Sequence, residues 1–175
     1  AEGHIGPIRS LAWNRDGSLL LSCDHGIEAV NEREFDLAHV KVWNDAGKEI
    51  NSLATDVPSS HACWSSDGRQ VLVGGSMRIR IWTPSERSQP IVRGVGQMGL
   101  NIPVAWNPTN DLLIAGTQFF NSNGMPRGTL PVRTIQLSGV DVSPDGQMLA
   151  IGSAKPSFYY YRADGEQVFA SPNLQ

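Results

Sequence analysis

The chain has 175 residues, of which 40% are hydrophobic and 18% are charged, and its formal net charge at pH 7 is −3. This length supports one sizeable hydrophobic core and the composition is that of a globular protein, so we expect neither a membrane span nor a signal peptide. The negative balance, without a cluster of Lys and Arg, argues against general phosphate binding.

Four segments of the chain repeat one pattern, in which an aromatic or β-branched residue precedes a polar turn and an apolar run. They read AWNRDGSLLLS from Ala12, CWSSDGRQVLVG from Cys63, AWNPTNDLLIAG from Ala105 and DVSPDGQMLAIG from Asp141. The anchor residues Trp13, Trp64, Trp106 and Val142 are 51, 42 and 36 residues apart. These periods average close to the roughly 40 to 45 residues of a four-stranded propeller blade.

Each copy predicts a sheet of four short antiparallel strands. Short apolar runs bounded by turn residues indicate strands rather than helices. In three copies an Asp-Gly pair separates the first two strands, and we expect a two-residue hairpin turn there because Gly adopts positive φ freely. The alternating segments 40–44 and 79–83 predict third strands, and segments 48–53 and 166–170 predict fourth strands.

The third copy departs from this pattern in its second half. Its segment 119–129 reads FFNSNGMPRGT, and the Gly, Asn and Pro residues predict turns and loops rather than a full strand. We therefore expect short or irregular outer strands in this copy, with residues 130–137 supplying the last one.

The Gly3-His4 pair, the turn residues and the third strands ending in Val-Trp-Asn and Ile-Trp-Thr resemble WD40 repeats. The resemblance covers nearly the whole chain and implies an all-β, WD40-like β-propeller with about four four-stranded antiparallel blades. It also implies a structural hydrogen-bond network, which by position in this chain would join His4, Ser22, Asp24 and Trp43. The Ser-Pro-Asp-Gly run from Ser143 is typical of a related propeller type, but the third-strand Trp residues favour WD40.

The repeat boundaries predict one propeller segment with blades at about 4–54, 55–93, 94–137 and 138–171. The WD40 resemblance implies a ring of about seven blades. Because terminal repeats leave an apolar side open, we expect this chain to belong to a larger ring that missing sequence or a partner chain completes. A closed ring of four blades is the alternative.

Three apparent chemical motifs have structural explanations. Residues 94–99 match the dinucleotide fingerprint, but a strand follows them instead of a helix, so we interpret them as a loop between blades. The Cys and His residues at positions 23, 25, 61 and 63 are of zinc-ligand type, but their spacing fits no familiar zinc site, and buried reduced cysteine is the expected state. The aromatic run 158–161 alternates between the two faces of a strand and is expected to pack between blades. We predict no metal and no cofactor.

We predict that the protein is not an enzyme. The candidate bases His4, His25, His39 and His61 belong to no motif in which a nucleophile, a base and an orienting group can be named. A propeller-fold hydrolase, with side chains converging from several blades, is kept as an alternative. Two cysteines without a disulfide framework suit a reducing compartment, so we expect an intracellular, cytoplasmic or nuclear protein.

We predict a protein–protein interaction scaffold, a subunit of a larger assembly, that binds a partner protein or peptide through loops on one propeller face. The acidic insertion 27–38 can steer and anchor a basic peptide, and a solvated surface loop is the alternative. The predicted partner-binding residues are His4, Glu28, Glu32, Glu34, Phe35, Arg78, Gln118 and Lys155. The other alternative is an RNA-binding propeller subunit of a ribonucleoprotein, with phosphates contacted by Arg78, Arg80, Arg93, Arg127 and Arg133.

Overall fold

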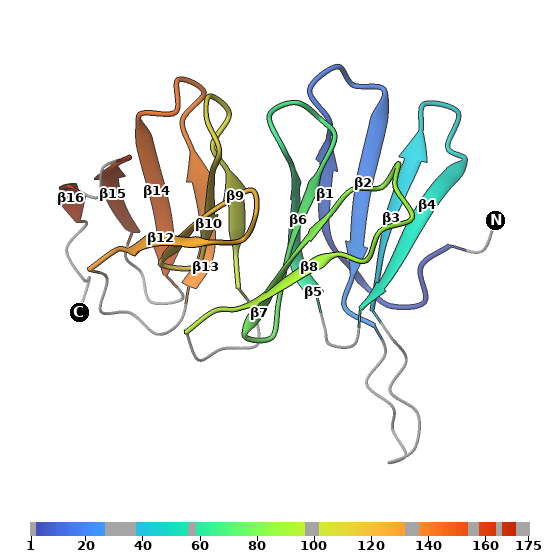
Figure 1. The fold of residues 1–175 in the computed structure, drawn as a ribbon, viewed down its shortest axis with the longest axis horizontal. Coiled ribbons are helices and arrows are strands. Elements are labelled where there is room, and N and C mark those ends of the chain that lie inside the picture. The colour runs from blue at the N-terminus through green and yellow to red at the C-terminus, as the bar shows by residue number, and fades with distance from the viewer. Residues whose placement is uncertain are drawn as a thin grey trace, which may run out of the picture.

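The computed structural model describes residues 3–26, 38–55, 59–96, 102–131, 137–153, 158–163 and 166–170. In these ranges the chain forms four sheets of four antiparallel strands, and each sheet is one propeller blade (Figure 1). Strands follow one another in chain order across every blade. The prediction of an all-β, propeller-like fold is therefore confirmed. No helix in the described ranges is long and apolar enough to cross a membrane.

The strands of each blade have the following bounds. Blade 1 contains β1 (Ile8–Trp13), β2 (Leu19–Asp24), β3 (Ala38–Asn44) and β4 (Glu49–Thr55), and blade 2 contains β5 (Ser59–Trp64), β6 (Val71–Gly75), β7 (Arg78–Trp82) and β8 (Ile91–Gly94). Blade 3 contains β9 (Val104–Trp106), β10 (Leu112–Ala115), β11 (Gln118–Asn121) and β12 (Pro126–Thr129), and blade 4 contains β13 (Leu137–Val142), β14 (Met148–Ser153), β15 (Phe158–Arg162) and β16 (Gln167–Ala170).

The first hairpin of a blade is longer than the two-residue turn predicted from the Asp-Gly pairs. Between β1 and β2, the N–H of Gly17 donates to the Asn14 carbonyl at 3.1 Å, and the N–H of Asn14 donates to the Leu19 carbonyl at 2.9 Å. Gly17 adopts φ +74°, and Asp16 Oδ1 accepts a hydrogen bond from the Ser18 N–H at 3.0 Å. The two-residue prediction was wrong because the Asp side chain closes the turn, while Gly supplies its left-handed last residue.

Blade 3 contains an outer hairpin within the segment that was predicted to form turns and loops, and its two strands are short and shifted in register, as expected for this copy. Strands β11 and β12 pair within 119–129, and the N–H of Gly124 donates to the Asn121 carbonyl at 2.8 Å in the turn between them. The expected last strand at 130–137 was wrong. Pro126 opens β12 at the blade edge, a position where the missing N–H of proline costs no ladder hydrogen bond, and Leu130 instead packs into the core between blades 3 and 4.

Every blade has two faces, and apolar side chains fill the spaces between neighbouring blades. We call the face toward the preceding blade in the chain the leading face, and the face toward the following blade the trailing face. The leading face of blade 2 carries Ala62, Trp64, Val71, Val73 and Trp82, and its trailing face carries Leu72, Ile79 and Ile81. Three such cores join the four blades. Figure 1 shows an open array, with blades 1 and 4 at its opposite ends, and this is not the closed four-bladed ring considered as an alternative.

Candidate functional site

The residues predicted to bind a partner fall in several blades. Glu28, Glu32, Glu34, Phe35 and Lys155 lie outside the described residues. Arg78 is exposed at the start of β7, and Gln118 is half-buried at the start of β11. The segment after β8 contacts the chain next to both residues. The Val95 N–H donates to the carbonyl of Met77, which precedes Arg78, at 2.9 Å, and the Gly96 N–H donates to Gln118 Oε1 at 3.1 Å. The structure therefore places Arg78 and Gln118 on either side of one loop.

The structure joins His4, Ser22, Asp24 and Trp43 in one chain of hydrogen bonds. The indole N–H of Trp43 donates to Ser22 Oγ at 2.7 Å, Ser22 Oγ lies 2.5 Å from His4 Nε2, and His4 Nδ1 lies 2.7 Å from Asp24 Oδ2. The His4 side chain is nearly buried and both of its nitrogens are engaged, so its place in blade 1 is structural.

Asp24 also fixes the base of the acidic insertion. Its Oδ1 accepts hydrogen bonds from the N–H groups of Gly26 at 3.0 Å and His39 at 2.7 Å, and these two residues flank segment 27–37. Burial alone would raise the pKa of Asp24, but hydrogen bonds from the His39 N–H, from His4 and from the Gly26 N–H outweigh it and hold the pKa below its ordinary value. A single ionised carboxylate therefore holds the points where the chain leaves and rejoins blade 1.

At the end of the blades formed by the first hairpins, three tryptophans line one hollow of about 480 Å³, which we call the tryptophan pocket. Its lining residues are Ala12, Trp13, Arg15, Cys63, Trp64, Ser65, Ser66, Trp106, Pro108, Thr109 and Pro144. Trp64 is buried and its indole N–H donates to the Ala12 carbonyl at 3.1 Å, which fixes the ring, while Trp13 is exposed. Tryptophan and proline surfaces of this kind bind apolar, aromatic or proline side chains.

A smaller hollow of about 240 Å³, which we call the acidic hollow, shares Ser65, Ser66 and Trp106 with the tryptophan pocket. Its charged residues are Asp67 and Asp111. Hydrogen bonds from the Ser65 hydroxyl and the Arg69 N–H lower the pKa of Asp67, so its carboxylate is ionised at neutral pH. An apolar pocket thus continues into a negatively charged hollow, an arrangement complementary to an apolar residue followed by Lys or Arg.

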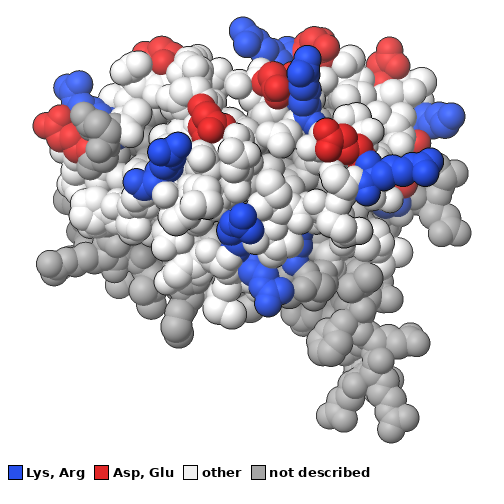
Figure 2. Space-filling view, viewed as in Figure 1, with Lys and Arg blue, Asp and Glu red and all other residues white. Residues whose placement is uncertain are grey.

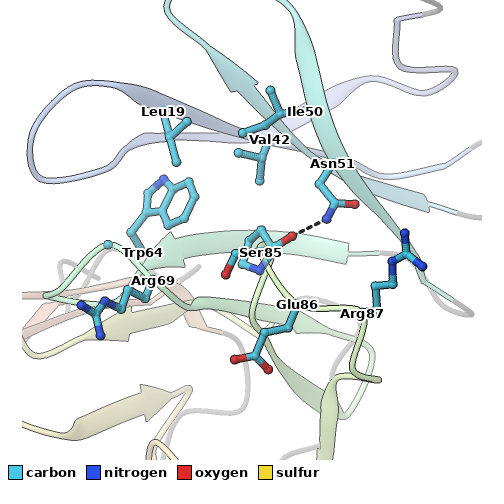
Figure 3. A pocket seen from close by; sticks show the side chains of 11 residues that line it. Leu19, Val42, Ile50, Asn51, Trp64, Arg69, Ser85, Glu86 and Arg87 are labelled. Atoms are coloured by element: carbon cyan, nitrogen blue, oxygen red, sulfur yellow. Dashed lines mark hydrogen bonds between the residues drawn. The ribbon is translucent and has the colours of Figure 1, made fainter.

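A third hollow, of about 540 Å³, opens between blades 1 and 2 (Figure 3). Leu19, Val42, Ile50 and Trp64 form its apolar part, and its rim carries charged side chains that include Glu86 and both Arg69 and Arg87. The Asn51 amide donates to the Pro84 carbonyl across this hollow. Trp64 lines both this hollow and the tryptophan pocket.

The described residues offer weak means for catalysis or phosphate binding. Burial raises the pKa of the Cys63 thiol to about 12, so it stays protonated near neutral pH. Within the described ranges, no three His, Cys, Asp or Glu side chains lie together as a possible metal site. Arg80 of the RNA-binding hypothesis is buried, and Arg93 donates from Nε to the Gly124 carbonyl at 3.1 Å. Figure 2 shows acidic and basic residues interspersed over the visible face.

The sequence contained a signal for the tryptophan pocket that the predicted site residues did not include. Trp13, Trp64 and Trp106 close the first strand of three successive copies, so the repeat places them at one end of neighbouring blades. In the sequence these tryptophans indicate the spacing of the repeats. Their contribution to a shared pocket depends on the spacing of the blades, which the periods do not reveal.

Comparisons with known proteins agree with this geometry. The family model for the WD domain, G-beta repeat, matches residues 1–27 and 39–83. The crystal structure of the β-propeller domain of Myceliophteria thermophila Cps50 (Swd1) is similar to this chain with a TM-score of 0.74 and 14% identity, over 92% of this chain and 54% of that chain. The chain thus spans about half the length of that solved structure, and likeness at this identity shows the fold. No curated protein sequence gives a match. Residues 1–27 and 39–83 thus match WD40 repeats, and the four consecutive blades of the described residues have the fold of a β-propeller.

Proposed function

We propose that this chain is a protein-interaction scaffold whose tryptophan pocket holds an apolar, aromatic or proline residue of a partner peptide. WD40 propeller domains generally serve as non-enzymatic interaction scaffolds in complexes. The observation that carries the proposal is the convergence of Trp13, Trp64 and Trp106, from three blades, on one hollow. Rigid blades fix these rings in place, which lowers the entropy lost when a peptide binds.

The charge around the pocket favours a basic peptide over RNA. Asp67 and Asp111 line the adjoining acidic hollow, where they attract Lys or Arg and repel phosphate. The predicted acidic insertion 27–38, whose flanking residues Gly26 and His39 bind Asp24, would add further negative charge to the chain. We therefore propose a partner segment that combines an apolar anchor with nearby basic residues.

An array of peptides tests this proposal. The array would pair Pro, Leu or Trp anchors with Lys, Glu or Ser at neighbouring positions, and bound chain would be measured against wild type. We expect peptides with an anchor and Lys to bind, and Trp13→Ala to weaken them about tenfold or more. Asp67→Asn and Asp111→Asn should weaken the Lys peptides and reduce the salt dependence of binding.

Ile8→Ala is the matched control, because Ile8 is an exposed apolar residue of the same strand that does not line the pocket. Peptide binding that survives Trp13→Ala, or that falls equally in Ile8→Ala, contradicts the pocket assignment. Tighter binding of single-stranded RNA than of any peptide would favour the ribonucleoprotein alternative. A third outcome is that changing Glu28, Glu32 and Glu34 to Gln abolishes peptide binding while the pocket variants still bind. This would assign the peptide site to the acidic insertion instead of the tryptophan pocket.

A further inference from the structure

The leading face of blade 1 exposes apolar residues at positions that blade 2 buries. Strand pairing makes Leu11 and Trp13 of blade 1 equivalent to Ala62 and Trp64 of blade 2, since each pair lies opposite the same positions of the second strand. Leu11 is 63% exposed and Trp13 is 60% exposed, whereas Ala62 is 6% and Trp64 is 8% exposed. The difference arises because blade 1 covers the leading face of blade 2.

The trailing face of blade 4 is exposed in the same way. Pairing makes Phe158 and Tyr160 equivalent to Ile79 and Ile81 of blade 2. Phe158 is 45% exposed and Tyr160 is 39% exposed, whereas Ile79 is 0% and Ile81 is 2% exposed. Phe158, Tyr160 and Phe169 form an aromatic cluster, with ring centroids of 5.5 Å between the first two and 5.7 Å between the first and third.

The two open faces complement each other in size. Beside the aromatic cluster lies a hollow of about 310 Å³ whose floor includes Gly139, Ala150 and Gly152. At the contact between blades 1 and 2, the small Ala62 faces a trailing face that carries Leu21. At the open faces the sizes are reversed, because Leu11 stands where Ala62 does and Ala150 stands where Leu21 does. A leading face with a large side chain and a trailing face with a hollow can therefore pack closely, as the small and large side chains between blades 1 and 2 do.

The polar groups of the two faces also match. The Trp64 N–H donates to the carbonyl of Ala12 on the trailing face of blade 1. The indole N–H of Trp13 has no hydrogen-bond partner among the described residues, and the carbonyl equivalent to that of Ala12 belongs to Asp141 of blade 4. Asp141 is exposed on this face, and Arg15, in the turn after Trp13, offers a cation to its carboxylate.

We propose that the leading face of blade 1 binds the trailing face of blade 4 in a second copy of this chain. Each copy carries one face of each kind, so two copies make two identical contacts and close about a two-fold axis. Two copies of four blades make eight, at the upper end of the roughly four to eight blades of known propellers.

Sedimentation velocity over about 1 to 100 µM protein tests this proposal, because dimer formation follows mass action. We expect wild type to form a dimer, and Leu11→Asp or Tyr160→Asp each to raise the dimer dissociation constant about a hundredfold, since each change affects both contacts. An equal mixture of the two variants should recover association, because a Leu11→Asp copy offers an intact trailing face to the intact leading face of a Tyr160→Asp copy. Met125→Asp, at an exposed apolar residue in the turn after β11, is the control and should leave the dimer unchanged.

A monomer throughout this range overturns the proposal and leaves the faces to a different chain or to further blades. A dimer that survives Tyr160→Asp but not Leu11→Asp overturns the head-to-tail arrangement in favour of contact between two leading faces. Far-UV circular dichroism of each variant separates lost association from lost folding. Trp13 and Arg15 belong to both proposed contacts, but Leu11 and Tyr160 do not line the tryptophan pocket, so their variants test the dimer alone.

Discussion

Blades 1 and 2 share one strand arrangement but are stabilised in different ways. In blade 2, Val73 and Trp82 are buried against blade 1. The equivalent positions of blade 1 carry Ser22 and Trp43, which join the hydrogen-bond network through His4 to Asp24. An end blade with an exposed leading face thus relies on side-chain hydrogen bonds where an inner blade relies on apolar burial. The comparison teaches that one repeat pattern can be stabilised by either means.

Truncating the buried tryptophan of blade 2 should have the largest effect. Trp82→Ala removes a ring that is almost fully buried, and we expect it to lower the free energy of unfolding by about 3–5 kcal/mol. Trp13→Ala, at an exposed ring of blade 1, should lower it by less than about 1 kcal/mol. Urea unfolding at low protein concentration, where contacts between copies contribute little, measures both. Equal effects would mean that neighbouring blades do not determine the stability of a face.

Removing the carboxylate of the network should come next. Asp24→Ala leaves the N–H groups of Gly26 and His39 and the His4 ring without their acceptor, and we expect a loss of about 2–4 kcal/mol. Blade 2 has Gly75 at the equivalent position, so it carries no carboxylate there. Asp16→Ala, at an exposed carboxylate in the first turn, is the control and should cost much less in the same urea measurement. A matching loss in both variants would argue against a special role for the network.

The acid dependence of stability should separate the two blades. The pKa of His61 in blade 2 is lowered by burial, so its stabilising contribution is present above an unfolded pKa of about 6.5 and is lost as pH falls below it. The pKa of Asp24 is also lowered, so its contribution is present above about 3.9 and is lost at lower pH. Urea midpoints between about pH 7.5 and pH 3 should fall in these two windows. His61→Leu should flatten the first window. Asp24→Asn should make the second window smaller without removing it, because the lowered pKa values of Asp16, Glu49, Asp67 and Asp145 act in the same range. A pH dependence identical to that of wild type in both variants would contradict these assignments.

The sequence predicted the features of the fold that depend on local chemistry. Alternation and turn residues were sufficient for the strands, and the resemblance to WD40 repeats named the four residues that the structure places in one network. Two errors also have local causes. The Asp side chain lengthened the first hairpin, and the edge position of Pro126 allowed a strand where its residue type suggested a loop.

The candidate site depended on contacts that the sequence does not encode in a short window. Trp13 and Trp106 are separated by two blade intervals, and they share a pocket because the first strands of successive blades lie side by side. The sequence also did not reveal the difference between Trp13 and Trp64, which hold equivalent positions in their repeats but are covered differently by other blades. Repeats reveal equivalent positions, and the number of neighbours then determines which of them stays exposed.

The smallest predicted effect concerns the turns, which the two blades share. Gly17 and Gly68 have φ +74° and +70°, and a Cβ atom would meet nothing within 4 Å at Gly17 and only ordinary contact with Asn14 at Gly68. Gly17→Ala and Gly68→Ala should therefore each cost about 1–2 kcal/mol, the strain of a left-handed conformation. Urea unfolding of the two variants measures whether the costs agree. Equal costs would show that the first hairpins of blades 1 and 2 are equivalent. The two blades would then differ in stability through the coverage of their faces and not through their turns. A much larger cost for Gly68→Ala would show that the neighbouring blade also supports the turn.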